Sequence, residues 1–134
     1  MAKYKKKLDA DIRCPLEYGL TIFGGKSGEY PQKLYKALMN SQTVLTVWDD
    51  ARLVGLIRVL DDSEMLAQIH YVLVHPEYQG QGIAGRMVEY IKEKYKNFMY
   101  LELMPEDKNN VPFYEKHGFH VMENVAAMQI CNIN

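Results

Sequence analysis

A glycine-containing loop at residues 79–84 carries the groups in this chain best suited to hold an anion. The loop reads QGQGIA, follows a strongly apolar segment and runs directly into a segment with helical periodicity. A strand that turns into a helix in this way directs several free backbone N–H groups toward one point, where the helix dipole adds partial positive charge. Gly80 and Gly82 let the backbone approach a ligand closely, and the amide of Gln79 can close one edge. The loop therefore predicts a phosphate-binding site.

Glycine loops also serve other purposes, and two of these fit the sequence poorly. A Walker nucleotide loop would end in Gly-Lys-Ser/Thr, which is missing here. A Rossmann fingerprint belongs near the start of a parallel sheet, whereas this loop follows a predicted antiparallel hairpin. A tight turn that binds no ligand stays open as a purely structural alternative.

Polar side chains lie on the strand predicted before the loop and on the strand predicted after it. Gln68 and His70 are two residues apart in the apolar segment 66–74, so they share one face of a strand that otherwise reads as buried. His70 can act as a base near neutral pH, whereas Gln68 cannot take a proton; a hydrogen-bonded core histidine is the alternative interpretation of His70. Glu102 lies on the following strand, where it could face the gap between the strands or solvent.

The apolar pattern predicts the elements that position these residues. Residues 43–48 and 53–60 are rich in β-branched and apolar types and are separated by a polar turn, which is a β-hairpin pattern. Segment 66–74 is apolar on both faces and is expected to be a central strand. The helix after the loop is the clearest in the chain, because its apolar residues fall on one face: Ile83, Met87, Val88, Ile91 and Tyr95.

The remaining predicted elements are shorter. A strand is expected near residues 20–23, and a helix is expected to begin at Pro31. Further elements follow the long helix: a strand at 98–103, a loop at 105–108, a helix at 111–116 and a last strand at 119–130. A hairpin that leads into a strand–helix–strand unit predicts a mixed α/β sheet with helices on both sides.

Length and composition indicate one compact domain over residues 1–134, with 48% apolar and 25% charged residues. The net charge of -1 does not favour nucleic acid or a membrane surface as a partner. The basic run Lys3–Lys7 is expected to be a solvated or frayed terminus. No apolar run approaches the roughly 20 residues that cross a bilayer, and Cys14 and Cys131 read as reduced thiols, so we expect a soluble, cytoplasmic protein. The four histidines show no metal-ligand spacing, and we expect no metal.

Two motifs make the sequence similar to a known family. Residues 72–84, VLVHPEYQGQGIA, resemble motif A of the GNAT acetyltransferases, whose core is Gln/Arg-x-x-Gly-x-Gly/Ala. Residues 112–119, PFYEKHGF, resemble motif B of that family, and the separation of the two motifs also fits. With the preceding hairpin, the resemblance covers roughly residues 43 to 130.

The resemblance implies a GNAT fold and acetyl-coenzyme A as cosubstrate. In that fold a mixed, mostly antiparallel sheet is splayed between its two central strands and flanked by helices. The backbone of Val72, Leu73 and Val74 would pair with the pantetheine arm, and the amides of residues 79–84 (Gln79, Gly80, Gln81, Gly82, Ile83 and Ala84) would hold the pyrophosphate. The thioester would lie in the gap between the strands at 66–74 and 98–103, where an acceptor amine enters.

The same resemblance implies roles in proton transfer. Attack on a thioester requires a neutral amine, so a base or a water chain to a base is useful, and the leaving thiolate benefits from a proton donor. Tyr114 occupies the motif B tyrosine that points at the cofactor sulfur, although core packing is its structural alternative. Gln68 falls where the histone-acetylating branch carries its glutamate base, and His70 falls where arylalkylamine acetyltransferases carry a histidine. Glu102 ranks third as a base.

The chain also departs from the family pattern. Asp107 stands where many members have Asn, and Asn110 where many have Ala, so Asn110 is the candidate contact to pantetheine with Asn109 as an alternative. Asp61 and Asp62 are expected to be turn residues, and attraction of a cationic amine is the alternative.

The hypothesis with the most support is therefore an N-acetyltransferase. It would transfer acetyl to a primary amine of a small molecule or peptide by direct attack within a ternary complex. The alternative is a module that binds acyl-coenzyme A without catalysis, as a sensor or a partner-docking protein; Gln68 in place of an acid favours it. Homodimers are common in the family, so a homodimer is expected from the resemblance alone.

Overall fold

The computed structural model describes residues 3–6 and 29–133. The chain divides into two units, Met1–Leu103 and Met104–Asn134, called here the first and second unit. The strand expected near residues 20–23 lies outside the described residues. The assignment of residues 1–134 to one domain stays a prediction.

The first unit is built on a five-stranded sheet in the order β1-β2-β3-β4-β5. The first four strands pair antiparallel, and β5 is parallel to β4, so the mixed, mostly antiparallel α/β sheet predicted from the sequence is confirmed. The strands are β1 (Lys3–Lys6), β2 (Thr43–Asp49), β3 (Arg52–Asp61), β4 (Leu66–Val74) and β5 (Tyr100–Leu103).

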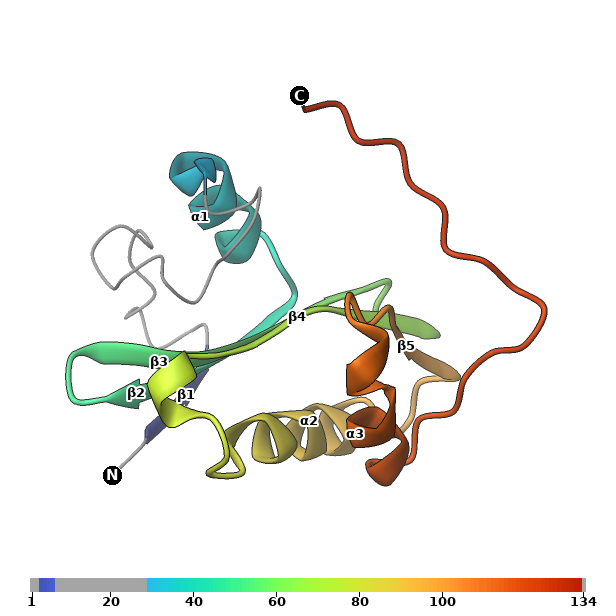
Figure 1. The fold of residues 1–134 in the computed structure, drawn as a ribbon. Coiled ribbons are helices and arrows are strands. Elements are labelled where there is room, and N and C mark those ends of the chain that lie inside the picture. The colour runs from blue at the N-terminus through green and yellow to red at the C-terminus, as the bar shows by residue number, and fades with distance from the viewer. Residues whose placement is uncertain (1–2, 7–28, 134) are drawn as a thin grey trace. The chain divides into compact units, whose positions relative to one another are not determined.

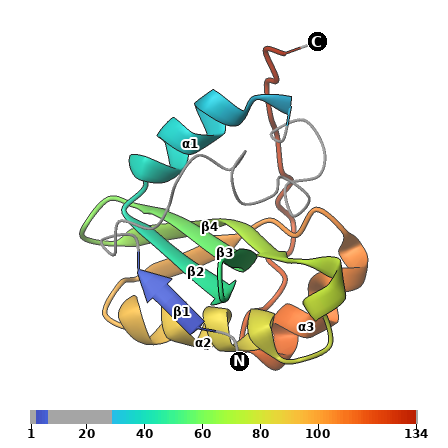
Figure 2. The same cartoon turned by 90° about the vertical axis from the view of Figure 1, so that its left-hand side faces the viewer.

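Helices α1 (Pro31–Met39) and α2 (Ile83–Lys94) cover opposite faces of this sheet (Figures 1 and 2). On the α1 face, the core contains Leu34, Leu38, Val44, Trp48, Leu53 and Leu56. On the α2 face, the five apolar residues predicted for the helix stripe are all buried: Ile83, Met87, Val88, Ile91 and Tyr95. Helical periodicity alone therefore identified this side of the core.

Gly55 on β3 lies where α2 comes closest to the sheet. A Cβ atom placed on Gly55 would lie 3.1 Å from Ile83 Cγ2 and 3.2 Å from Val47 Cβ. These distances are shorter than ordinary van der Waals contact, so the start of α2 can approach β3 only because Gly55 has no side chain. This packing fixes the position of the loop that precedes α2.

A buried polar network anchors the other end of α2 to the sheet. The Tyr95 hydroxyl donates to Asp61 Oδ2 at 2.6 Å and lies 2.6 Å from Thr43 Oγ1. Burial and the hydrogen bond to the Asp61 carboxylate raise the pKa of Tyr95 to about 12. Tyr95 therefore joins the end of α2 to the beginning of β2 and the end of β3.

The basic run near the N-terminus departs from its prediction as a solvated or frayed end. Lys3–Lys6 form β1, whose backbone pairs antiparallel with β2 from Lys3 opposite Trp48 to Lys6 opposite Leu45. Strand pairing uses backbone groups that every residue except proline supplies, so a lysine-rich sequence can form an edge strand. The backbone of Lys3–Lys6 is therefore paired and not frayed, because net charge says nothing about an available sheet edge.

The second unit contains η6 (Lys108–Asn110) and α3 (Val111–Lys116), and α3 has the predicted bounds. Gly118, with φ of +93°, ends the helix, and the N–H of Phe119 donates to the Tyr114 carbonyl at 3.1 Å. The strand predicted at residues 119–130 is wrong, because residues 119–133 form no strand. Its apolar residues Val121, Met122, Val125, Met128 and Ile130 are exposed. Local composition gives only the capacity to form a strand, whereas a strand also needs a partner to accept its hydrogen bonds.

Candidate functional site

The loop after β4 has the backbone conformation that its glycines predict. A short helix η5 (Pro76–Tyr78) follows β4, and Gly80 and Gly82 then adopt φ of +81° and +82°. A Cβ atom on either glycine would meet nothing within 4 Å, so the space beside the loop is open. Glycine is favoured here by the left-handed backbone and not by crowding.

The N–H groups of this loop are available to a ligand. Gly82 is the N-cap residue of α2, and no side chain caps this helix end. Within the described part of the chain, no hydrogen bond is donated by the N–H of Gly80, Gln81 or Gly82. The first N–H groups of a helix have no partner inside the helix, and they lie at the positive end of its dipole. The loop therefore has the donor set that a diphosphate requires.

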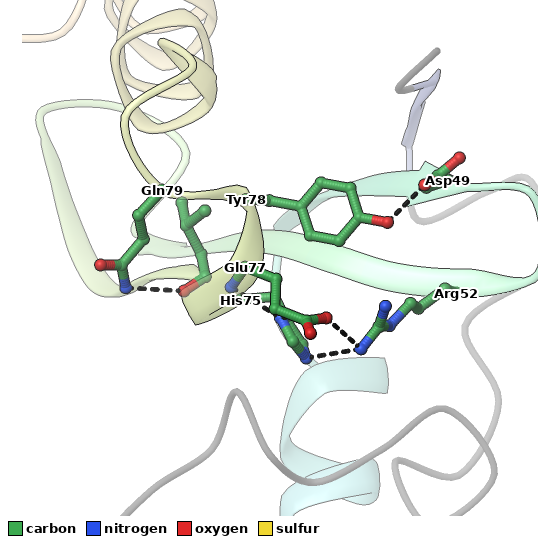
Figure 3. Close-up of polar contacts among 7 residues, drawn as sticks. Asp49, Arg52, His75, Glu77, Tyr78 and Gln79 are labelled. Atoms are coloured by element: carbon green, nitrogen blue, oxygen red, sulfur yellow. Dashed lines mark hydrogen bonds and ion pairs between the residues drawn. The ribbon is translucent and has the colours of Figure 1, made fainter.

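Gln79 connects the loop to the end of β4. Its side-chain Nε2 donates to the Val74 carbonyl oxygen at 3.2 Å (Figure 3). The side-chain amide thus hydrogen-bonds the last carbonyl of the strand and fixes the point at which the loop begins. The remaining predicted loop residues, Ile83 and Ala84, form the first turn of α2, with Ile83 buried and Ala84 half-buried.

A polar cluster that the sequence analysis missed holds the turn between β4 and the loop against the β2–β3 hairpin (Figure 3). The N–H of Glu77 donates to Nδ1 of the buried His75 at 3.1 Å, and Arg52 pairs with the Glu77 carboxylate at 2.7 Å. The Tyr78 hydroxyl donates to Asp49, and this hydrogen bond raises the pKa of Tyr78. Only the polar residues around the hairpin turn and the His-Pro pair could have indicated this cluster from the sequence.

The two contacts of the His75 ring cannot both be hydrogen bonds in the neutral imidazole. Glu77 N–H donates to Nδ1, and Arg52 Nη2, which can only donate, lies 3.2 Å from Nε2. A neutral ring has one accepting nitrogen, so one contact is a hydrogen bond and the other is a close approach. Either arrangement leaves His75 occupied in holding the turn.

Beyond its first four residues, β4 has an open edge. β5 pairs only with Leu66–Ile69, from Leu66 opposite Tyr100 to Ile69 opposite Leu103, whereas β4 continues to Val74 (Figure 1). On that side, no described residue of the first unit pairs with residues 71–74. An extended ligand can add to such an edge as though it were a further strand. The predicted pantetheine contacts, Val72, Leu73 and Val74, lie in this stretch.

Glu102 and Gln68 are neighbours on one face of the sheet. Gln68 pairs in register with Glu102 on β5 and with Leu60 on β3. Ala67 and Ile69, which alternate with Gln68, are buried on the α2 face, so Gln68 and Glu102 lie on the opposite face. Both side chains are half-buried. The register therefore places Glu102 on the same face of the sheet as Gln68.

His70 lies at a β-bulge and not in a buried strand. The register of β3 and β4 passes from Arg58–Tyr71 to Val59–Ile69, which leaves His70 as the extra residue. The side chain of His70 is exposed, and β4 as a whole is only partly buried although it lies between two strands. The expectation that His70 and Gln68 interrupt a doubly buried strand is therefore wrong, because the bulge and the short β5 leave one face of β4 accessible.

The contact with Arg58 determines the protonation of the His70 ring. Nδ1 lies 2.9 Å from Arg58 Nη1, and a guanidinium can only donate. Nδ1 must therefore accept, and the proton of the neutral ring is on Nε2. While this contact is present, the Nδ1 lone pair cannot receive a proton from an amine.

The aspartates after β3 serve the turn. Asp62 Oδ1 accepts hydrogen bonds from the N–H groups of Glu64, Met65 and Leu66, at 2.9, 2.8 and 3.1 Å, and these bonds lower its pKa. Asp61 accepts from Ser63 N–H at 2.8 Å as well as from Tyr95. Of the two interpretations of these residues, the structural one accounts for their contacts.

The second unit carries Tyr114 and Asn110. The half-buried Tyr114 ring packs edge-on against Phe113 and Phe119, with ring centroids 5.0 and 5.9 Å apart. Burial raises the pKa of the Tyr114 phenol, so the hydroxyl keeps its proton at neutral pH. Asn110 is exposed at the N-cap of α3, and its N–H donates to the Asp107 carbonyl at 2.9 Å. A protonated hydroxyl is what a donor to a leaving thiolate requires.

The described residues contain neither a metal-binding cluster nor a membrane-spanning helix. No group of three or more histidine, cysteine, aspartate or glutamate residues in residues 3–6 and 29–133 is arranged to hold a metal ion. None of the helices in the same residues is long and apolar enough to span a membrane.

Comparison with known proteins places the chain in a family. The model of the acetyltransferase (GNAT) family matches residues 16–119, which is well over half of the chain. This protein belongs to the GNAT acetyltransferase family. An uncharacterized N-acetyltransferase from Bacillus methanolicus is 34% identical over 117 residues, which cover 87% of this chain and 92% of that protein. The chain spans only part of two other curated relatives. The matched residues cover 52% of one of these proteins and 31% of the other.

Solved structures of a probable and a predicted acetyltransferase share the fold. A probable acetyltransferase from Staphylococcus aureus is 27% identical and superposes with a TM-score of 0.79, covering 98% of this chain and 99% of that one. A predicted acetyltransferase from Clostridium acetobutylicum, solved with acetyl-CoA, is 15% identical and has a TM-score of 0.68, covering 96% of both chains. The GNAT fold predicted from the two sequence motifs is thus confirmed.

Proposed function

We propose that this GNAT protein transfers the acetyl group of acetyl-CoA to a primary amine of a small molecule or peptide, by direct attack within a ternary complex. Family membership supports acetyl transfer in general. The finer proposal is carried by one observation, which is that the glycine loop and the open edge of β4 lie next to each other in the first unit. The loop offers unpaired N–H groups for a diphosphate, and the edge offers backbone groups for an amide-containing arm.

The residues present fit coenzyme A. The N–H groups of residues 80–82 would hold the pyrophosphate, and residues 72–74 would pair with the pantetheine arm. The neighbour from Clostridium acetobutylicum was solved with acetyl-CoA, which supports the same ligand here. When bound, acetyl-CoA supplies an activated acetyl thioester. We propose Asn110 as a further contact to the pantetheine arm.

Proton transfer is assigned by the contacts of the candidate side chains. Glu102 would take a proton from the attacking amine, directly or through water, because the half-buried carboxylate is on the accessible face beside Gln68. Gln68 would orient the amine or the water by hydrogen bonding. His70 is less suited than Glu102, since its Nδ1 is engaged by Arg58. Tyr114 would donate a proton to the sulfur as the carbon–sulfur bond breaks.

A coenzyme A thiol assay tests the proposal. We expect release of free thiol with at least one member of an acceptor panel of polyamines, aminoglycosides, arylalkylamines, amino acids and peptide N-termini. A saturable complex with coenzyme A, but no thiol release with any acceptor, would favour the alternative, a non-catalytic sensor of acyl-coenzyme A. Tyr114→Phe separates the two functions further, because it should lower the rate of an enzyme and leave a sensor unchanged.

A further inference from the structure

Among the residues that the structure describes, the half-buried Arg58 has only neutral partners. Its Nε donates to Ser41 Oγ at 2.7 Å, its Nη1 donates to His70 Nδ1 at 2.9 Å, and its guanidinium carbon lies 5.7 Å from the centroid of the Tyr71 ring. No carboxylate within the described part of the chain pairs with Arg58. The ion pairs found there involve other cations: Arg52, Lys92 and Lys96.

This arrangement leaves binding capacity unused. A guanidinium has five N–H donors and stays charged at all physiological pH values, and the contacts with Ser41 and His70 use two of the donors. Partial burial removes water from the group and lowers the pKa of Arg58. A cation that has lost part of its hydration gains from an anionic partner more than a fully solvated one does. The remaining donors of Arg58 are therefore suited to a carboxylate or phosphate.

Arg58 also lies on the face of the sheet that carries the proposed base. Arg58 and Leu60 are two residues apart on β3, so they share a face, and Leu60 continues in register to Gln68 and then Glu102. Adjacent strands are about 4.8 Å apart and successive residues rise about 3.3 Å along a strand. Arg58 and Glu102 lie two strands and two residues apart, so their backbones are separated by roughly 12 Å on this face. A cation and a carboxylate at this separation can hold the two ends of one small zwitterion.

We propose that Arg58 binds an anionic group of the acceptor, so that the acceptors of this enzyme are primary amines that also carry a carboxylate or a phosphate. This inference rests on the proposed acetyl transfer, because it names the substrate class of that reaction. The amine end faces Glu102 and Gln68, and the anionic end faces Arg58. His70 and Ser41 are positioning residues, since they hold the guanidinium in place.

Calorimetric binding of matched amines tests this assignment without requiring turnover. With coenzyme A saturating, β-alanine is compared with β-alaninamide, and phosphoethanolamine with ethanolamine. The wild-type protein should bind the anionic member of at least one pair about 10-fold or more tighter, as charge-assisted hydrogen bonds to a guanidinium imply. The two pairs distinguish a carboxylate acceptor from a phosphate acceptor. Equal affinity within both pairs, including no binding of any of the four, would overturn the proposal.

Variants then assign the preference to Arg58. In Arg58→Gln, the preference should fall to about 2-fold or less, because the charge is lost while the side chain stays polar. Lys94→Gln removes the same charge from the exposed side of α2, on the opposite face of the sheet, and should keep the wild-type preference. Persistence of the full preference in Arg58→Gln, or its loss in Lys94→Gln, would contradict the role of Arg58.

Two further measurements keep the test decisive. Arg58→Lys keeps the charge and tests the proposal even if Arg58→Gln does not fold. It should retain a preference for the anionic amine that is smaller than that of the wild type. An unchanged preference would exclude a role for the guanidinium fork.

Coenzyme A should bind Arg58→Gln with an affinity within about 2-fold of the wild type. A loss as large as that for the anionic amine would assign Arg58 to the cofactor and overturn the proposal. Failure of the acetyltransferase function is a separate result, in which the preference and its dependence on Arg58 are seen but no amine yields free thiol.

Discussion

At the scale of single residues, the neighbours of each ionisable group determine which chemistry it can do. The guanidinium of Arg58 engages His70 Nδ1, while Glu102 lies beside Gln68 on the accessible face of the sheet. Both His70 and Glu102 were candidate bases from the sequence, and the contacts favour Glu102. The choice depends on a contact between two strands, which the order of residues along the chain does not reveal.

Replacement of Glu102 by Gln tests this choice. We expect kcat to fall by about 100-fold at neutral pH, because loss of a general base typically costs that much or more. His70→Asn should lower kcat by less than about 10-fold, and it should raise the KM of an anionic acceptor because Arg58 loses a positioning contact. Glu93→Gln on the exposed side of α2 is the matched control. If steady-state kinetics showed that His70→Asn lowers kcat more than Glu102→Gln does, His70 and not Glu102 would be the general base.

The Tyr114 hydroxyl should contribute to the rate by donating a proton to the leaving thiolate. Burial raises the pKa of the phenol, so the donor form persists to a higher pH than an ordinary tyrosine would allow. Tyr114→Phe keeps the ring that packs on Phe113 and Phe119, and it should lower kcat by roughly 10- to 100-fold with coenzyme A affinity unchanged.

The pH profile provides the check. In the wild type, activity should fall on the alkaline side only above about pH 10, where an ordinary tyrosine ionises, and the fall should be absent in Tyr114→Phe. Tyr35→Phe on α1 is the control for loss of a tyrosine hydroxyl. A profile that is the same in wild type and Tyr114→Phe would remove Tyr114 from the reaction.

At the scale of elements, two glycines serve different purposes around the same helix. Gly82 adopts a left-handed backbone beside open space, whereas Gly55 has an ordinary backbone in a crowded contact with Ile83. Gly82→Ala should cost about 1–2 kcal/mol of folding free energy and weaken coenzyme A at least about 10-fold, because the new residue strains the loop.

Gly55→Ala is the matched comparison for that change. It should cost about 1–3 kcal/mol through overpacking against Ile83 and Val47, and the folded variant should bind coenzyme A normally. Urea denaturation and calorimetry together separate the two effects. Equal losses of affinity in Gly82→Ala and Gly55→Ala would mean that affinity follows stability and not loop conformation.

The Tyr95 network predicts how α2 responds to alkaline pH. The folded state raises the pKa of Tyr95 to about 12, above its ordinary value of about 10, so folding favours the neutral phenol. The stabilisation is therefore complete below about pH 10 and is lost as the pH rises toward 12. Tyr95→Phe should cost about 1–3 kcal/mol at neutral pH, since it breaks the hydrogen bonds with Asp61 and Thr43.

Urea denaturation at pH 8, 10 and 11 measures this effect. The wild type should lose its advantage over Tyr95→Phe across the two higher values. A constant difference between the two proteins at all three pH values would show that the ionisation of Tyr95 is not linked to folding.

At the scale of the whole molecule, the sequence predicts what depends on local pattern and misses what depends on pairing. The bounds of β4 and α3 and the buried stripe of α2 follow from apolar runs, helical periodicity and turn residues within short windows. The pairing of β1, the bulge at His70 and the absence of a strand at 119–133 depend on which edges meet in space. The same reason hides the His75 cluster, whose members come from two distant segments.

The candidate site likewise has parts that local sequence pattern predicts and parts that depend on strand pairing. The glycine loop was predicted from its residues, because six consecutive positions fix its conformation. The grouping of Arg58, Gln68 and Glu102 on one face could not be predicted, since it requires the register of three strands. Family resemblance supplied the role that we propose for Tyr114, which local pattern alone does not distinguish from core packing.

Titration of the purified protein with coenzyme A and acetyl-CoA in a calorimeter tests the central claim most directly. That claim is that the free amides after β4 hold a diphosphate, with the open strand edge holding the arm attached to it. We predict saturable binding of one molecule per chain for both compounds, weakened at least about 10-fold in Gly82→Ala and unchanged in Gly55→Ala. Absence of saturable heat for both compounds, measured at two temperatures, would contradict the account.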